Sequence, residues 1–172
     1  FEQVEIGASL DASHKRGEYL RKGQSWQQVE DNRKRMFDTC PRAYFFLATC
    51  LDVFNSFHVP EFHIDWYERG WIKDEGSLIN PLLTPAYLRI QMLPAPLKDQ
   101  LREKYNTAQE WMDKNTKSKS KRYDALIKFL DEADYSHKIK EWYRTTERLD
   151  DMRNENWRDV FPELQDLPKY IK

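Results

Sequence analysis

The order of strand-like and helix-like segments constrains the fold of this chain more than any other feature. Residues Val4 to Asp11 (VEIGASLD) alternate between apolar and polar side chains, which is the period-two pattern of a strand. Tyr44 to Phe54 and Tyr87 to Leu93 are the next strand candidates. Helical segments separate and follow them. Strands that alternate with helices form parallel βαβ units with right-handed crossovers.

Several helix ends can be read from the sequence. Ser25 and Gln28 have the spacing of a capping box, and the helix that they open should end near Thr39. Pro60 and Gly70 bracket a second, shorter helix. Further helices are expected at about 96–115, 123–130 and 139–149. The basic run 114–122 (KNTKSKSKR) is expected to be a flexible connection between two of them.

The polar faces of the first and third predicted strands indicate the fold class. An open sheet covered by helices on both sides has almost continuously apolar strands. Here polar side chains line one side, namely Glu5, Ser9, Asp11, Arg89 and Gln91. We therefore expect an α/β fold: a partial (β/α) barrel of parallel strands in residues 1–95, and a helical extension in residues 96–172 that packs on the barrel. The polar side would face a cleft that holds a polar substrate.

Charge and cysteine content exclude several function classes. The net charge of −1 provides no overall field that would attract nucleic acid or an anionic membrane. Only two cysteines occur, Cys40 and Cys50, which suits a reducing compartment and predicts a cytoplasmic protein. No apolar run approaches the roughly 20 residues needed to span a bilayer. The four histidines lack the spacing of a metal site, so we expect no metal ligands in this chain. The first residue is Phe1, and the start looks cut from a longer sequence.

Polar residues follow the predicted strands at their carboxyl ends, where ligands bind in βα architectures. These residues are Ser9 and Asp11, Asp52 and Asn55, and Gln91. Arg21, in the loop after the first strand, could bind a carboxylate through two nitrogens. The alternative is that Asp11 and Asn55 are turn or capping residues, which these residue types favour. Asp11 and Asp52 could also form a carboxylate pair for hydrolysis, if they face each other.

The stretch IGASLDASHKRGEYLRKGQSWQQVEDNRKRM (6–36) resembles the second half of radical S-adenosylmethionine (radical SAM) enzymes of the SPASM/Twitch type. In these enzymes a strand ends in Ser-x-Asp-(Gly/Ala), and an Arg-x-Gly segment, an aromatic residue and a helix with Val-x-x-Asn follow. The matching residues are Ser9, Asp11, Ala12, Arg21, Gly23, Trp26, Val29 and Asn32. Residues 49–72 look like the next strand and helix of the family, and residues 149–164 look like its C-terminal segment.

The resemblance implies a function and a role for each residue. Ser9 and Arg21 would hold the carboxylate or amino end of S-adenosylmethionine, and Asn55 would contact its ribose region. Asp11 would face the substrate or orient its loop, and it is the catalytic candidate. Independently of the resemblance, the polar side of the predicted strands makes Glu5, Arg89 and Gln91 the candidate substrate-binding residues. The implied chemistry is reductive cleavage of S-adenosylmethionine at a 4Fe-4S cluster, which gives a deoxyadenosyl radical that abstracts hydrogen from a small-molecule or peptide substrate.

One departure from the family is serious, because the cluster needs three cysteines in a C-x₃-C-x₂-C spacing. Cys40 and Cys50 cannot supply it. The ligands are expected upstream, in a missing N-terminal segment of the same protein, and the chain alone should be inactive. Two alternatives stay open. One is a protein- or RNA-interaction module that uses Lys117, Lys119, Lys121 and Arg122. The other is a barrel hydrolase or isomerase that uses Asp11 and Asp52.

Overall fold

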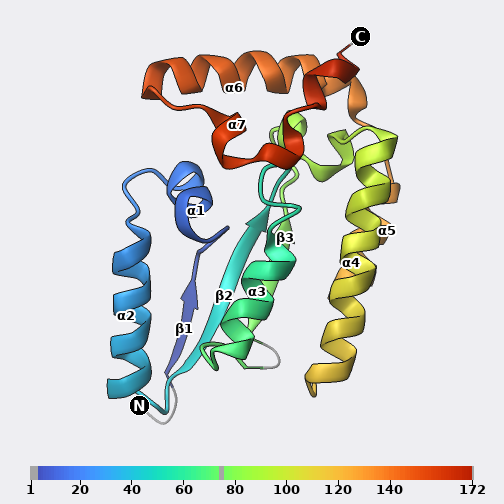
Figure 1. Ribbon diagram of the computed structural model, residues 1–172. Helices are drawn as coiled ribbons and strands as arrows, with labels where there is room; N and C mark the ends of the chain where they lie inside the picture. Colours follow the sequence, from blue (N-terminus) through green and yellow to red (C-terminus); the bar gives the residue numbers. More distant parts are fainter. Residues whose placement is uncertain (1–3, 74–75, 172) are drawn as a thin grey trace.

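Three parallel strands form one sheet in the computed structural model, which describes residues 4–73 and 76–171 (Figure 1). The strands are β1 (Glu5–Ala8), β2 (Tyr44–Leu51) and β3 (Ser77–Pro81), in the order β1-β2-β3. Gly7 pairs with Phe46, and Thr49 pairs with Ile79. The predicted parallel pairing of the first two strands is therefore confirmed.

Helices connect the strands and form the rest of the molecule. Ser25 caps α2 as predicted, because its side chain accepts a hydrogen bond from the backbone N–H of Gln28 at 3.4 Å. The α-helices are α1 (His14–Leu20), α2 (Trp26–Thr39), α3 (Val59–Glu68), α4 (Ala95–Asn115), α5 (Arg122–Asp131), α6 (Ile139–Arg153) and α7 (Trp157–Val160). The 3₁₀ helices are η1 (Ala86–Leu88), η2 (Ile90–Met92), η3 (Ser136–Lys138), η4 (Pro162–Leu164) and η5 (Leu167–Tyr170).

The predicted partial barrel is wrong. Among the described residues the sheet is open, has three strands and does not curve into a barrel. The third strand was also placed wrongly, because η1 and η2 occupy the predicted stretch Tyr87 to Leu93, and β3 lies before it at Ser77–Pro81. Apolar and polar residues alternate in this stretch of sequence, but Ile90, Gln91 and Met92 are all buried, so the alternation does not correspond to two faces of a strand. A short apolar run cannot distinguish these structures.

The two faces of the sheet differ in burial. Alternate β2 residues, among them Phe45 and Leu47, are buried in a core cluster with Trp26 of α2 and with Phe62 and Trp66 of α3. The opposite side, here called the open face, consists of half-buried or exposed residues: Glu5, Gly7, Tyr44, Phe46, Ala48, Cys50, Leu78 and Asn80. In the described part of the chain, helices thus cover one face of the sheet.

A second core joins the strand ends to the C-terminal helices. This core contains residues from both predicted domains, including Leu51 from the first and Tyr105 and Trp142 from the second. The division into two domains between residues 95 and 96 stays a prediction. Figure 1 shows α6 and α7 beyond the carboxyl ends of the strands. Asp150 of α6 accepts hydrogen bonds from the Tyr19 hydroxyl at 2.7 Å and from the backbone N–H of Trp157 at 2.5 Å. These two bonds join α1, α6 and α7.

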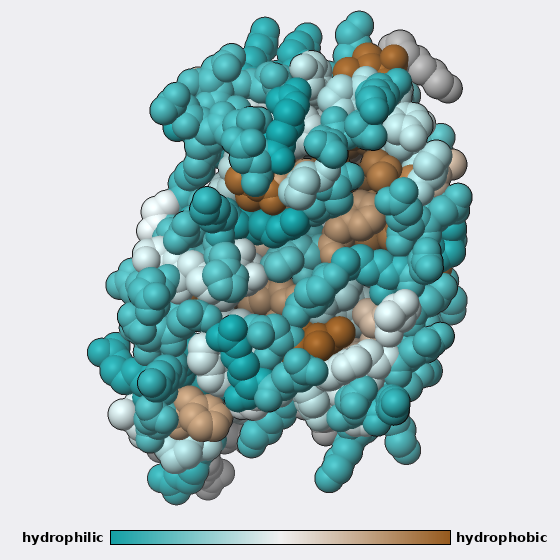
Figure 2. Space-filling view, in the orientation of Figure 1, coloured by the Kyte–Doolittle hydropathy of each residue, from teal (hydrophilic) through white to brown (hydrophobic). Residues whose placement is uncertain are grey.

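The surface seen in Figure 2 is largely hydrophilic, with separate hydrophobic patches. No described helix combines the length and the apolar character needed to cross a bilayer.

Candidate functional site

Asp11 joins the carboxyl ends of β1 and β2. Its Oδ1 accepts a hydrogen bond from the backbone N–H of Cys50 at 2.9 Å. Its Oδ2 accepts one from Nε of Arg21 at 2.7 Å, in an ion pair whose carboxylate side chain is 13% exposed. Each carboxylate oxygen therefore already has a protein donor. This arrangement suits a group that organises the site better than one that exchanges a proton with a substrate.

Asn55 completes the link between the two strand ends. Its Nδ2 donates to the backbone oxygens of Asp11 at 3.0 Å and of Cys50 at 2.7 Å. Its Oδ1 accepts from the backbone N–H of Asp52 at 2.9 Å, and the residue is fully buried. Both amide hydrogens bind backbone oxygens of the protein, so Asn55 holds the ends of β1 and β2 together and has no donor left for a ligand.

Asp52 is the most perturbed carboxylate of this region. Its Oδ1 accepts hydrogen bonds from the backbone N–H groups of Phe54 at 2.9 Å and Asn55 at 3.1 Å. Burial raises the pKa of Asp52 to about 7, the two backbone donors oppose that rise, and the nearby Asp11 adds to it. Burial, with smaller contributions from Asp11 and Asp52, also raises the pKa of the Cys50 thiol. The strand ends therefore hold a carboxyl group that is partly protonated at neutral pH and a protonated thiol.

Arg21 and Ser9 are the predicted cofactor-binding residues that remain accessible. Arg21 is held through Nε, and within residues 4–73 and 76–171 its Nη1 and Nη2 atoms make no hydrogen bond. Its side chain is 38% exposed, so the two Nη atoms could bind a carboxylate. Ser9 is exposed and directly follows β1.

The loop after β1 returns Arg21 to Asp11 because α1 packs tightly against the start of that loop. A Cβ on Gly17 would lie 2.5 Å from the backbone oxygen of Ala12, so only glycine fits there. Gly23 has a φ of +84°, a conformation that glycine adopts without strain. The two glycines therefore allow a compact turn that brings residue 21 beside residue 11.

The predicted substrate-binding residues are dispersed. Glu5 is exposed on the open face. Arg89 donates from Nε to the backbone oxygen of Leu83 at 2.6 Å, and Gln91 is buried, with Nε2 donating to the backbone oxygen of Phe129 at 2.7 Å. Because η1 and η2 replace the predicted third strand, Arg89 and Gln91 do not share a face with Glu5, Ser9 and Asp11. The expectation of a common polar side is corrected accordingly.

Histidines and cysteines form no metal centre in the described part of the chain. Nε2 of His58 lies 2.8 Å from Oγ of Ser13, and burial lowers the pKa of His58 to about 4. Nε2 of His63 lies 3.1 Å from Oγ1 of Thr49, and burial lowers its pKa to about 3. Cys40 and Cys50 are free thiols near opposite ends of β2. They do not fit the ligand set of an iron–sulfur cluster.

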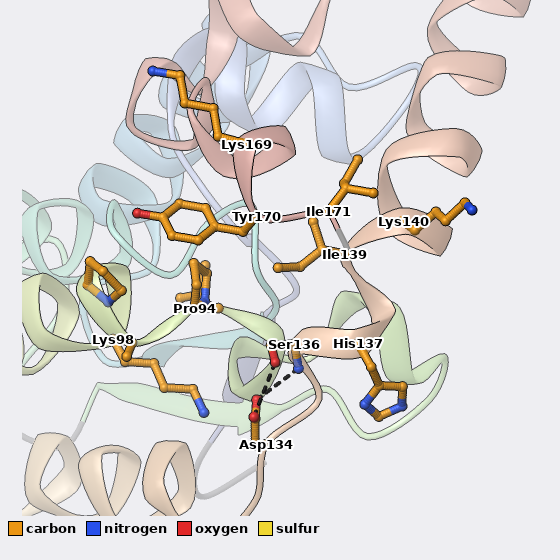
Figure 3. A pocket seen from close by; sticks show the side chains of 13 residues that line it. Pro94, Lys98, Asp134, Ser136, His137, Ile139, Lys140, Lys169, Tyr170 and Ile171 are labelled. Carbon is orange, nitrogen blue, oxygen red and sulfur yellow. Dashed lines mark hydrogen bonds between the residues drawn. The ribbon is translucent and has the colours of Figure 1, made fainter.

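A separate cavity lies elsewhere in the molecule. It has a volume of about 780 Å³ and lies between the first turn of α4, the η3–α6 junction and the C-terminal residues (Figure 3). Its polar groups do not converge on one point: Lys98 donates to the backbone oxygen of Ala133, Asp134 binds Ser136, and Lys140 and Lys169 extend away from one another. None of the predicted site residues lines it. Size alone therefore does not make it the functional site.

Two features of the open face were missed from the sequence. Cys50 lies on it, but β2 is too apolar for its register to be read in advance. Leu78 and Asn80 of β3 also lie on it, and the sequence Ser-Leu-Ile-Asn shows no polar–apolar alternation that would have revealed that strand.

Comparison with known proteins adds no relative. No family model, no curated protein and no solved structure matches the chain.

Proposed function

We propose that the chain is the C-terminal portion of a radical SAM enzyme, and that it contributes to the binding of S-adenosylmethionine and of a small-molecule or peptide substrate. The resemblance of residues 6–36 to that family suggests the function. The observation that carries the proposal is the Arg21 guanidinium, fixed through Nε with its Nη atoms accessible at the carboxyl ends of parallel strands. Ligands of parallel α/β folds bind at this edge.

In this proposal Arg21 and Ser9 bind the amino-acid end of S-adenosylmethionine, and the nucleoside lies over the strand ends that Asn55 holds together. A 4Fe-4S cluster, if bound by other parts of the protein, would supply the electron that cleaves S-adenosylmethionine into methionine and a deoxyadenosyl radical, and the residues of this chain would position and shield the reacting groups. Because Cys40 and Cys50 do not fit a cluster, we place the cluster ligands in sequence upstream of Phe1. The open face, with Glu5, is the surface proposed to meet the substrate in a cytoplasmic enzyme.

The proposal is tested by the sequence that precedes Phe1 and by the activity of the protein that contains it. A C-x₃-C-x₂-C motif is expected there, and the protein purified without oxygen should form 5′-deoxyadenosine from S-adenosylmethionine and a strong reductant. Arg21→Gln should lower that rate at least tenfold, and Arg42→Gln, at an exposed arginine before β2, should not change it. A preceding sequence without the cysteine motif, together with no deoxyadenosine, would contradict the proposal.

The structure gives less support to an interaction module built on the basic run. Lys121 forms an ion pair with Asp113, and Arg122 donates to the backbone oxygen of Ser77 at 2.8 Å. Two of the four cationic groups that were expected to bind a partner therefore already bind within the protein.

A further inference from the structure

Asp11 is fixed at three points, which is more than a turn residue requires. Its two carboxylate oxygens accept from Cys50 N–H and Arg21 Nε, and its backbone oxygen accepts from Nδ2 of Asn55 at 3.0 Å. The first and third of these bonds tie Asp11 to β2 and to the turn that follows it. The remaining oxygen, Oδ2, therefore has a defined position from which to orient Arg21.

A guanidinium held through Nε has little freedom left. Its five N–H donors lie in one plane, and a bond to Nε sets the direction in which the Nη1 and Nη2 edge points. That edge matches the two oxygens of a carboxylate. Since Arg21 is 38% exposed and its Nη atoms make no hydrogen bond to the described residues, the edge is presented to solvent and not to the protein.

We propose that Asp11 is a positioning residue: it orients the Arg21 guanidinium so that the Nη edge binds the carboxylate of the amino-acid end of S-adenosylmethionine. This inference rests on the proposed function and goes beyond it, because it gives Asp11 a task that neither touches the substrate nor transfers a proton.

Electrostatics and positioning predict opposite results when Asp11 is neutralised. The Asp11 carboxylate is a negative charge close to the proposed anion site, so its Coulomb effect alone weakens the binding of a carboxylate. Asp11→Asn keeps an oxygen that can accept from Cys50 N–H, but its amide cannot both keep that bond and accept from Arg21 Nε. If orientation dominates, this variant loses part of its preference for a ligand that carries the carboxylate. If charge dominates, that preference increases.

The experiment compares two ligands that differ at the amino-acid end. S-adenosylmethionine and decarboxylated S-adenosylmethionine, which lacks only the carboxylate, are titrated into the wild-type protein, Asp11→Asn, Arg21→Gln and the double variant. We expect wild type to prefer S-adenosylmethionine, and Asp11→Asn to lose about tenfold of that preference. The double variant should be no weaker than Arg21→Gln, because Asp11 acts through Arg21.

The outcomes separate the two levels of the proposal. A wild-type protein without preference for S-adenosylmethionine would contradict the proposed function. A wild-type preference that Asp11→Asn retains or increases, or an equal loss for both ligands, would overturn the positioning role alone. Arg21→Lys leaves the bond between Asp11 and Cys50 in place: it keeps the charge but lacks both the Nε donor to Asp11 and the planar fork, so positioning predicts that the preference is lost.

Discussion

Replacing Asp52 by asparagine should stabilise the protein at pH 8 and have little effect at pH 4.5. The asparagine oxygen can still accept hydrogen bonds from the Phe54 and Asn55 N–H groups that bind Oδ1 of Asp52. What changes is the ionisation, because burial raises the pKa of Asp52 from 3.8 to about 7. Between these values the folded protein binds a proton that the unfolded chain releases.

The magnitude follows from proton linkage. A group whose pKa is higher in the folded state makes stability fall as pH rises from its unfolded to its folded pKa. At about 1.4 kcal/mol for each tenfold change in acidity, the rise from 3.8 to about 7 corresponds to a ceiling of about 4 kcal/mol. Local relaxation and water contact reduce this cost, so we expect Asp52→Asn to gain about 2–3 kcal/mol at pH 8.

Urea denaturation of wild type and Asp52→Asn at pH 4.5 and pH 8 measures the effect. Asp38→Asn is the matched control, because Asp38 is exposed near the end of α2 and should give the same small difference at both pH values. An Asp52→Asn variant with equal effects at both pH values, or with a loss of stability at pH 8, would refute the argument that a buried charge at the strand end is costly.

Three further changes test the packing around the site, each by urea denaturation. Burial lowers the pKa of His63 to about 3, so its contribution to stability should be constant above pH 6.5 and fall by about 2 kcal/mol between pH 7 and pH 5. His63→Leu should lack that loss, and an unchanged pH dependence in this variant would count against the role of His63. Gly17→Ala should cost about 1–3 kcal/mol, because the new Cβ would lie 2.5 Å from the Ala12 oxygen, and a neutral result would mean that the loop can shift. Asp150→Ala should lower the free energy of unfolding by about 2–4 kcal/mol, because it leaves the buried Tyr19 hydroxyl and the Trp157 backbone N–H unpaired. Asp151→Ala, at an exposed position, should change it by no more than about 0.5 kcal/mol. Equal losses for the two variants would contradict the role of Asp150 in joining α1, α6 and α7.

Local patterns predicted those elements whose signals are strong. The first strand alternates cleanly, Ser25 has the capping spacing, and Pro60 and Gly70 bracket α3 closely. The prediction of the third strand failed because η1 and η2 occupy this stretch and Ile90, Gln91 and Met92 of η2 are all buried; a seven-residue pattern does not distinguish 3₁₀ helices from a strand. The error mattered, since it placed Arg89 and Gln91 on the same side as Asp11.

The rule that ligands bind at the carboxyl ends of parallel strands selected residues that do lie together, but it could not show how they interact. Asp11, Arg21 and Asn55 do meet where parallel strands end. Their mutual hydrogen bonds depend on the path of the chain between β1 and α2. That path is set by the close approach of Gly17 to the backbone of the buried Ala12, which cannot be read from the spacing of residues in the sequence. The open face could not be predicted from β2, because Phe46 on that face is as apolar as Phe45 and Leu47 on the covered one.

The most direct test of the account is to map where S-adenosylmethionine binds. Backbone amide NMR shifts should change at Ser9, Arg21 and Cys50, at the strand ends, when the ligand is added, and these changes should disappear in Arg21→Gln. Changes confined to the cavity near Tyr170 and Ile171, or no change at saturating ligand, would contradict the claim that the carboxyl ends of β1 and β2 form the binding site.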